Sequence, residues 1–160
     1  MHRYRPLYLL ILFAPLTARA DMALALRALE QGNHVAAYHE LSHLALAGNP
    51  AAQYNLGFLY FQGTGVRQDE RKAFYWFNHS ARSEYAHAQD VLGYLYNHGL
   101  GVERDRMRAY VWYTVAAANG IFLAESIKEK LARTLKASER IQADLMVEDY
   151  LKHYQSETND

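Results

Sequence analysis

Apolar residues recur every three or four positions in several stretches of the chain, and short glycine-containing segments separate these stretches. The first clear stripe consists of Ala52, Leu56, Leu59 and Tyr60, and the second consists of Ala73, Trp76, Phe77 and Ala81. Both spacings put the apolar side chains on one face of an α-helix. Between them, Gly63 can adopt the left-handed conformation that ends a helix, and Asp69 can cap the next one. The pattern predicts a hairpin of two helices.

The hairpin occurs twice. A shift of 36 residues superposes Ala52–Ala81 on Ala88–Ala117 with thirteen identities and no gap. The first copy contributes Ala52, Gln53, Leu56, Gly57, Leu59, Tyr60, Gly63, Gly65, Val66, Asp69, Ala73, Trp76 and Ala81. Gly57 would cost its helix about 1 kcal/mol relative to alanine, so we expect a second helix to cross close to the backbone there. The repeat is therefore the unit from which the protein is built.

A single hairpin cannot bury its own apolar face, so neighbouring hairpins must stack on it. We expect a degenerate hairpin at Asp21–Gln31 and His34–Ala47, and a closing pair of helices at Ile121–Leu135 and Ser138–Tyr154. In the closing pair we expect Ile141, Leu145 and Tyr150 to face inward. The predicted fold is an all-α solenoid, one domain over residues 21–154. Its parts are residues 21–48 (degenerate repeat), 50–83 and 86–119 (full repeats) and 121–154 (cap), and residues 155–160 are expected to fray.

The first twenty residues resemble a secretory signal peptide. Arg3 and Arg5 give a positive start, the run Leu7–Leu16 is mostly apolar, and Ala18-Arg19-Ala20 is a small-x-small cleavage pattern. We expect cleavage before Asp21 and a periplasmic or secreted protein. A buried N-terminal helix and an uncleaved anchor are the alternatives.

Charge and cysteine usage narrow the possible partners. Without residues 1–20 the chain keeps 14 basic residues (17 − 3) against 17 acidic ones, a net charge of −3. No basic excess remains to neutralise phosphates, so we expect no nucleic-acid partner. The absence of cysteine excludes disulfides and a lipid-modified cysteine, and we expect no membrane span after cleavage.

The repeat pattern Ala-Gln-x-x-Leu-Gly-x-x-Tyr-x-x-Gly-x-Gly-Val-x-x-Asp, followed by Ala, Trp and Ala, resembles the Sel-one-like repeat (SLR) family. That family is similar to the tetratricopeptide repeats. The resemblance implies a right-handed α-solenoid that acts as an adaptor for protein or peptide partners, with no cofactor, and exported bacterial members are often tied to envelope functions or host contact. Lys72 and Arg108 alternate where the family usually has lysine.

One segment has a catalytic pattern. His39-Glu40-Leu41-Ser42-His43 matches H-E-x-x-H, in which two histidines bind zinc and the glutamate activates water. Glu70 or Glu84 could supply a third ligand. The motif lies on the second helix of the degenerate repeat, however, and the repeat already accounts for a helix there. We therefore expect no metal site and no enzyme, and keep a zinc-dependent hydrolase as the alternative.

The face opposite the packing stripe on the first helix of each hairpin differs between the two copies. It carries Tyr54, Phe58, Phe61 and Gln62 in one copy, and Asp90, Tyr94, Asn97 and His98 in the other. In tetratricopeptide-like stacks such positions line the concave surface. The resemblance therefore suggests a partner-binding face made of Tyr54, Phe58, Gln62, Asp90, Tyr94, Asn97 and His98. Packing between hairpins is the alternative, balanced against binding for Tyr54 and Tyr94 and favoured for Phe58 and Phe61.

These observations favour an exported, non-enzymatic scaffold for protein–protein interaction in the bacterial cell envelope or outside the cell. A regulator that binds a peptidoglycan-type ligand has the same sequence features and remains a second alternative.

Overall fold

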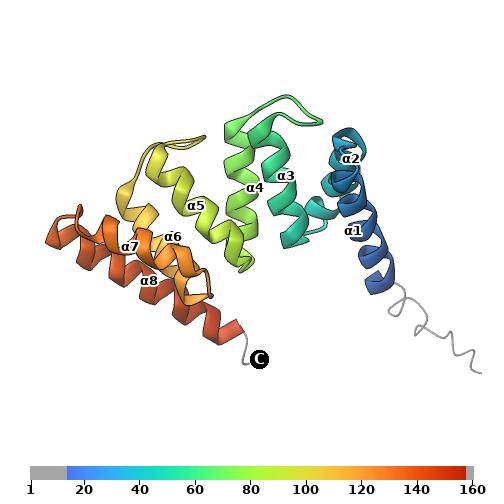
Figure 1. Cartoon of the computed structure of the whole chain (residues 1–160). Coiled ribbons are helices and arrows are strands. Elements are labelled where there is room, and N and C mark those ends of the chain that lie inside the picture. Colours follow the sequence, from blue (N-terminus) through green and yellow to red (C-terminus); the bar gives the residue numbers. More distant parts are fainter. Residues whose placement is uncertain (1–13, 158–160) are drawn as a thin grey trace, which may run out of the picture.

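The computed structural model describes residues 14–157, and this part of the chain is built of helices and turns without a strand. The helices are α1 (Ala14–Glu30), α2 (His34–Leu46), α3 (Pro50–Gln62), α4 (Glu70–Arg82), α5 (Ala86–His98), α6 (Arg106–Ala118), α7 (Phe122–Ala132) and α8 (Ala137–Glu157). Successive helices from α1 to α7 pack on one another, and α8 packs on α6 rather than on α7. The hairpins follow along an arch (Figure 1). The predicted all-α solenoid is confirmed.

The helix ends have the local causes that the sequence indicates. The carboxylate of Asp69 accepts a hydrogen bond from the Lys72 amide at 3.0 Å, and Asp105 caps α6 in the same way. Gly63 ends α3 at φ 70° and Gly99 ends α5 at φ 72°, in the left-handed region that glycine adopts without strain. Each turn therefore stops one helix and starts the next.

Two glycines inside helices let the hairpins close tightly. A Cβ atom at Gly57 would lie 2.9 Å from the ring of Phe77, and one at Gly93 would lie 3.0 Å from the ring of Tyr113. The second helix of each hairpin thus lays an aromatic ring directly on the backbone of the first, as expected for Gly57. Phe77 is fully buried and Tyr113 is 2% exposed.

The hairpin loops also join successive repeats. A side chain on Gly65 would collide with the backbone of His34, and one on Gly101 would collide with the backbone of Glu70. Each loop therefore lies against the start of the second helix of the preceding hairpin. This contact fixes the spacing between repeats.

The C-terminal pair of helices differs from the prediction. Helix α7 ends at Ala132 rather than Leu135, and α8 runs on to Glu157, into the segment expected to fray. Helix α8 packs alongside α6 (Figure 1), with Ala143 and Val147 buried. Because these residues occupy the buried face of α8, Ile141 and Leu145 are left 64% and 60% exposed, so their predicted inward orientation is wrong.

Tyr150 does point inward, as predicted. Its ring packs edge-on against Trp112 at 5.3 Å, and its hydroxyl donates to the Ala81 carbonyl at 3.1 Å. The hydroxyl of Tyr110 donates to Asp144 at 2.8 Å. These contacts fasten α8 to the two full repeats.

The predicted signal peptide is largely outside this structure. Residues 1–13 lie outside the described residues, and α1 begins at Ala14. Within residues 14–157, no helix has both the length and the hydropathy needed to cross a bilayer.

Candidate functional site

We call the predicted partner-binding positions of α3 and α5 the first-helix face: Tyr54, Phe58, Gln62, Asp90, Tyr94, Asn97 and His98. Gln62 and His98 are exposed, Tyr94 is 44% exposed, and the other four are partly buried. Within α5 the rings of Tyr94 and His98 lie 4.2 Å apart. His98 Nδ1 donates to the Tyr94 carbonyl at 2.9 Å, which orients the imidazole.

Tyr54 connects α3 to the segment that begins α5. Its ring lies 4.9 Å from that of Phe58 and 5.9 Å from that of Phe77 in the core. It also lies 5.0 Å from Tyr85 and 6.2 Å from His87, two residues that flank the start of α5. Tyr54 therefore packs between two hairpins and is partly exposed. Its role in binding a partner stays a prediction.

Asp90 is the acidic residue of the first-helix face. Its Oδ1 atom is enclosed by the protein and has no hydrogen-bond partner, although the residue as a whole is partly exposed. Burial raises the pKa of the Asp90 carboxyl, and His87 opposes this shift. Desolvation raises the pKa because it disfavours the charged form of a carboxyl group.

The Asp90 carboxyl group raises the pKa of two tyrosines. Burial raises the pKa of Tyr113 first, and the nearby Asp90 and Tyr94 raise it further. The pKa of Tyr54 is raised by burial, by Tyr85 and by Asp90. The Asp90 carboxyl group therefore acts electrostatically on a tyrosine of α3 and on a tyrosine of α6. We call Tyr54, Tyr85, His87, Asp90, Tyr94 and Tyr113 the Asp90 cluster.

Sequence reasoning missed Tyr85, His87 and Tyr113 as members of this site. The 36-residue shift contained a signal, because it aligns Asp90 with Tyr54 and Tyr113 with Phe77. A carboxylate and a phenol thus replace two aromatic rings that contact each other in the preceding repeat. Of the remaining predicted residues, Gln62, Asn97 and His98 lie at the C-terminal ends of their helices, away from the Asp90 cluster in the sequence. The fourth, Phe58, packs edge-on against Phe77, with the ring centroids 5.0 Å apart.

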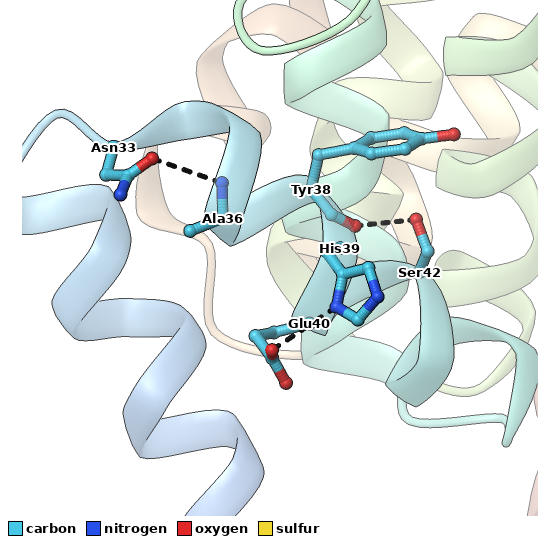
Figure 2. A network of polar contacts seen from close by, with 6 residues as sticks. All are labelled: Asn33, Ala36, Tyr38, His39, Glu40 and Ser42. Carbon is cyan, nitrogen blue, oxygen red and sulfur yellow. Dashed lines mark hydrogen bonds and ion pairs between the residues drawn. The ribbon is translucent and has the colours of Figure 1, made fainter.

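The H-E-x-x-H segment lies on α2, where Figure 2 shows His39 beside Glu40. His39 Nδ1 lies 3.3 Å from Glu40 Oε1, and the rings of His39 and His43 are 4.8 Å apart. His39 and His43 are exposed. Neither Glu70, at the start of α4, nor Glu84, between α4 and α5, completes a set. Among the side chains that the structure describes, residues 21–152, no group of three His, Cys, Asp or Glu is placed to hold a metal ion.

Two hollows of the described chain lie elsewhere. One, of about 920 Å³, runs along the loop edge between residues 66–72 and 99–103, and its lining mixes basic and acidic side chains. Another, of about 640 Å³, lies between α4, α6 and α8 beside Trp112 and Tyr150. Neither includes a residue of the predicted binding face.

Comparison with known proteins identifies the repeat. A family model described as "Sel1 repeat" matches residues 50–85 and 86–121. The crystal structure of c5321, a protective antigen present in uropathogenic Escherichia coli strains that displays an SLR fold, matches with a TM-score of 0.81 and 32% identity, over 88% of this chain and 31% of that one. A Sel1 repeat protein from Oxalobacter formigenes matches with a TM-score of 0.65 and 34% identity, over 71% of this chain and 88% of that one. The chain thus spans about a third of the E. coli protein. No curated protein matches it.

Proposed function

The chain belongs to the Sel1 repeat family, and from this we propose that it is an exported, non-enzymatic scaffold that binds a protein or peptide on its first-helix face. Sel1 repeat proteins are generally scaffolds for protein–protein interaction. The proposal adds three points to this general role: export, the absence of catalysis and the location of the binding face.

The observation that carries the binding face is the contrast between matched and variable positions. The matched residues are used for stacking: Leu56 and Leu92 are buried, and Gly57 and Gly93 accept aromatic rings on their backbones. Among the variable positions, Gln62 and His98 are exposed and the ring of Tyr94 is 44% exposed. Exposed aromatic rings are enriched among the residues that dominate binding energy.

Export is supported by the first twenty residues, with their basic start, apolar run and small-x-small pattern. The E. coli neighbour is described as a protective antigen, which is consistent with an exported protein. Fractionation of cells and mass analysis of the purified chain test this part. We expect a periplasmic or extracellular product that begins at Asp21; an intact N-terminus in the cytoplasm would contradict it.

Affinity capture from the cell envelope tests the binding face. We expect wild-type protein to retain a partner that Tyr94→Ala loses. Tyr75→Ala is the matched control, because Tyr75 is 52% exposed but lies on α4, the second helix of its hairpin. Equal loss in both variants, or identical partner lists for Tyr94→Ala and wild type, would count against this face.

A further inference from the structure

We infer that the hollow between α4, α6 and α8 binds the C-terminal aromatic residue of a peptide, with the ring on the aromatic floor of the hollow and the carboxylate at Arg82. This inference goes beyond the proposed function, because none of the residues that line the hollow belongs to the first-helix face. The volume of about 640 Å³ lies within the range of about 300–1,000 Å³ that is typical of ligand sites. Three features of the structure carry the inference: the walls of the hollow, its floor and the charges at its rim.

Helices bound the hollow on three sides. Its walls include Asn78 and Arg82 of α4, Arg108 and Trp112 of α6, and Met146 of α8. Arg82, Arg108 and Met146 are exposed, so the rim of the hollow is open to solvent. A hollow walled in this way admits the end of a chain more easily than the middle of a peptide, because the middle of a peptide needs a second opening through which the chain can leave.

Aromatic residues form the floor of the hollow. The ring of Tyr150 packs edge-on against the indole of Trp112, with 5.3 Å between the ring centroids. Tyr96 and Trp112 also line the hollow and are each 8% exposed, so the core holds both residues while a small part of each remains accessible. Aromatic pairs in such edge-on arrangements contribute more than the area that they bury. The floor therefore favours an aromatic side chain over an aliphatic one.

The charges at the rim favour an anion. Arg108 already pairs with Asp105, with 3.4 Å between Nε and Oδ2. The two acidic residues of the rim, Glu84 and Asp149, also take part in interactions of their own. Arg82, in contrast, forms no ion pair with any side chain that the structure describes. The charge that is left for a ligand is therefore positive, and a guanidinium can bind a carboxylate through two parallel N–H groups.

Three N-acetylated tetrapeptides test the inference: Ala-Ala-Ala-Phe with a free carboxylate, the same peptide as its C-terminal amide, and Ala-Ala-Ala-Ala with a free carboxylate. Each is titrated into Trp76→Phe protein, in which Trp112 is the remaining tryptophan and its fluorescence reports on the hollow. Calorimetric titration of the wild-type protein gives the same affinities without that substitution.

We expect the phenylalanine peptide with its free carboxylate to change the emission of Trp112. It should bind about threefold to fivefold more tightly than its amide, as expected for an ion pair at an exposed arginine. The alanine peptide should bind at least about tenfold more weakly than the phenylalanine peptide, because it has no ring to bury on the floor.

One variant and one control complete the test. Arg82→Gln should bind the free carboxylate and the amide with equal affinity. Arg27→Gln removes the same charge from an exposed position on α1 and should keep the preference for the carboxylate. A preference that survives Arg82→Gln, or that is lost equally in Arg27→Gln, would overturn the inference.

Equal affinity of the wild-type protein for the acid and the amide would also overturn it, as would a phenylalanine peptide that leaves both the Trp112 emission and the calorimetric signal unchanged. None of these outcomes concerns the first-helix face, because the proposed function is tested separately by the partner that Tyr94→Ala loses.

Discussion

Asn119 Nδ2 donates a hydrogen bond of 2.8 Å to the buried side-chain oxygen of Gln89. Gln89 in turn donates to the Ala81 carbonyl at 3.3 Å, so its amide is satisfied at both ends. In the preceding repeat Gln53 makes the corresponding bond to Ala45 at 3.2 Å, but its oxygen is buried without a partner. The residue 36 positions before Asn119 is Ser83, which is too short to reach it.

Ser83→Asn should therefore stabilise the protein. Ser83 and Asn119 have nearly the same backbone, with φ −89° and ψ 26° for the first and φ −91° and ψ 18° for the second. A new bond to the orphaned oxygen should add about 1 kcal/mol to the free energy of unfolding, measured by urea denaturation. Asn119→Ser is the reverse substitution and should cost a similar amount. Loss of stability in Ser83→Asn would show that water already satisfies Gln53.

The stability lost when a loop glycine is replaced by alanine should depend on the atoms around it rather than on its φ angle. Gly101 and Gly120 both have positive φ, at 68° and 89°. Gly120→Ala meets no atom within 4 Å, so it should cost only the backbone strain, about 1–2 kcal/mol. Gly101→Ala adds a collision with the Glu70 backbone and should lower Tm clearly further. Equal Tm values for the two variants would show that the loop can move away from α4.

The contact between Tyr110 and Asp144 should hold α8 on α6. Tyr110→Phe removes the hydroxyl that donates to Asp144 at 2.8 Å and keeps the buried ring. We expect a loss of about 1 kcal/mol and faster hydrogen exchange in residues 137–151. Tyr75→Phe, which removes a hydroxyl from a half-exposed ring on α4, is the control and should leave both measurements unchanged. Unaltered exchange in α8 would show that Val147 and Tyr150 hold the helix without this bond.

The sequence predicted the features of the fold that depend on local backbone geometry. Gly63 and Asp69 act within a few residues of their own position, and the repeat shows each of them twice. The face that α8 buries was not predictable in this way. The pairs Ile141 with Leu145 and Ala143 with Val147 have the same spacing of four, and only packing against α6 selects the smaller pair.

For the binding face, too, one part could be predicted from the sequence and another could not. Comparing repeats identifies Tyr54 and Asp90 as positions that vary, since this needs only the alignment of the chain with itself. The approach of Tyr113 to Asp90 depends on how α6 lies on Gly93, and the approach of Tyr85 to Tyr54 depends on how one hairpin stacks on the next. Such contacts join distant parts of the chain, so helical periodicity carries no information about them.

Asp90→Asn should raise stability near neutral pH. Burial raises the pKa of Asp90 in the folded protein, with His87 opposing and Tyr54 and Tyr113 facing the same group. Between the unfolded-state pKa, about 3.9, and the raised folded value, the folded state binds more protons than the unfolded state, so the contribution of Asp90 to stability falls as pH rises. Asparagine removes this cost. The variant should therefore have a higher Tm than wild type at pH 7, and the difference should shrink as pH falls through the folded pKa of Asp90.

Thermal unfolding of both proteins from pH 7 to pH 4 checks this prediction, and Glu129→Gln controls for the loss of one negative charge at an exposed position. A residue that weakens the fold at working pH but serves ligand binding is typical of a functional site. If Asp90→Asn lowered Tm at pH 7, the carboxylate would be a stabilising part of the hairpin.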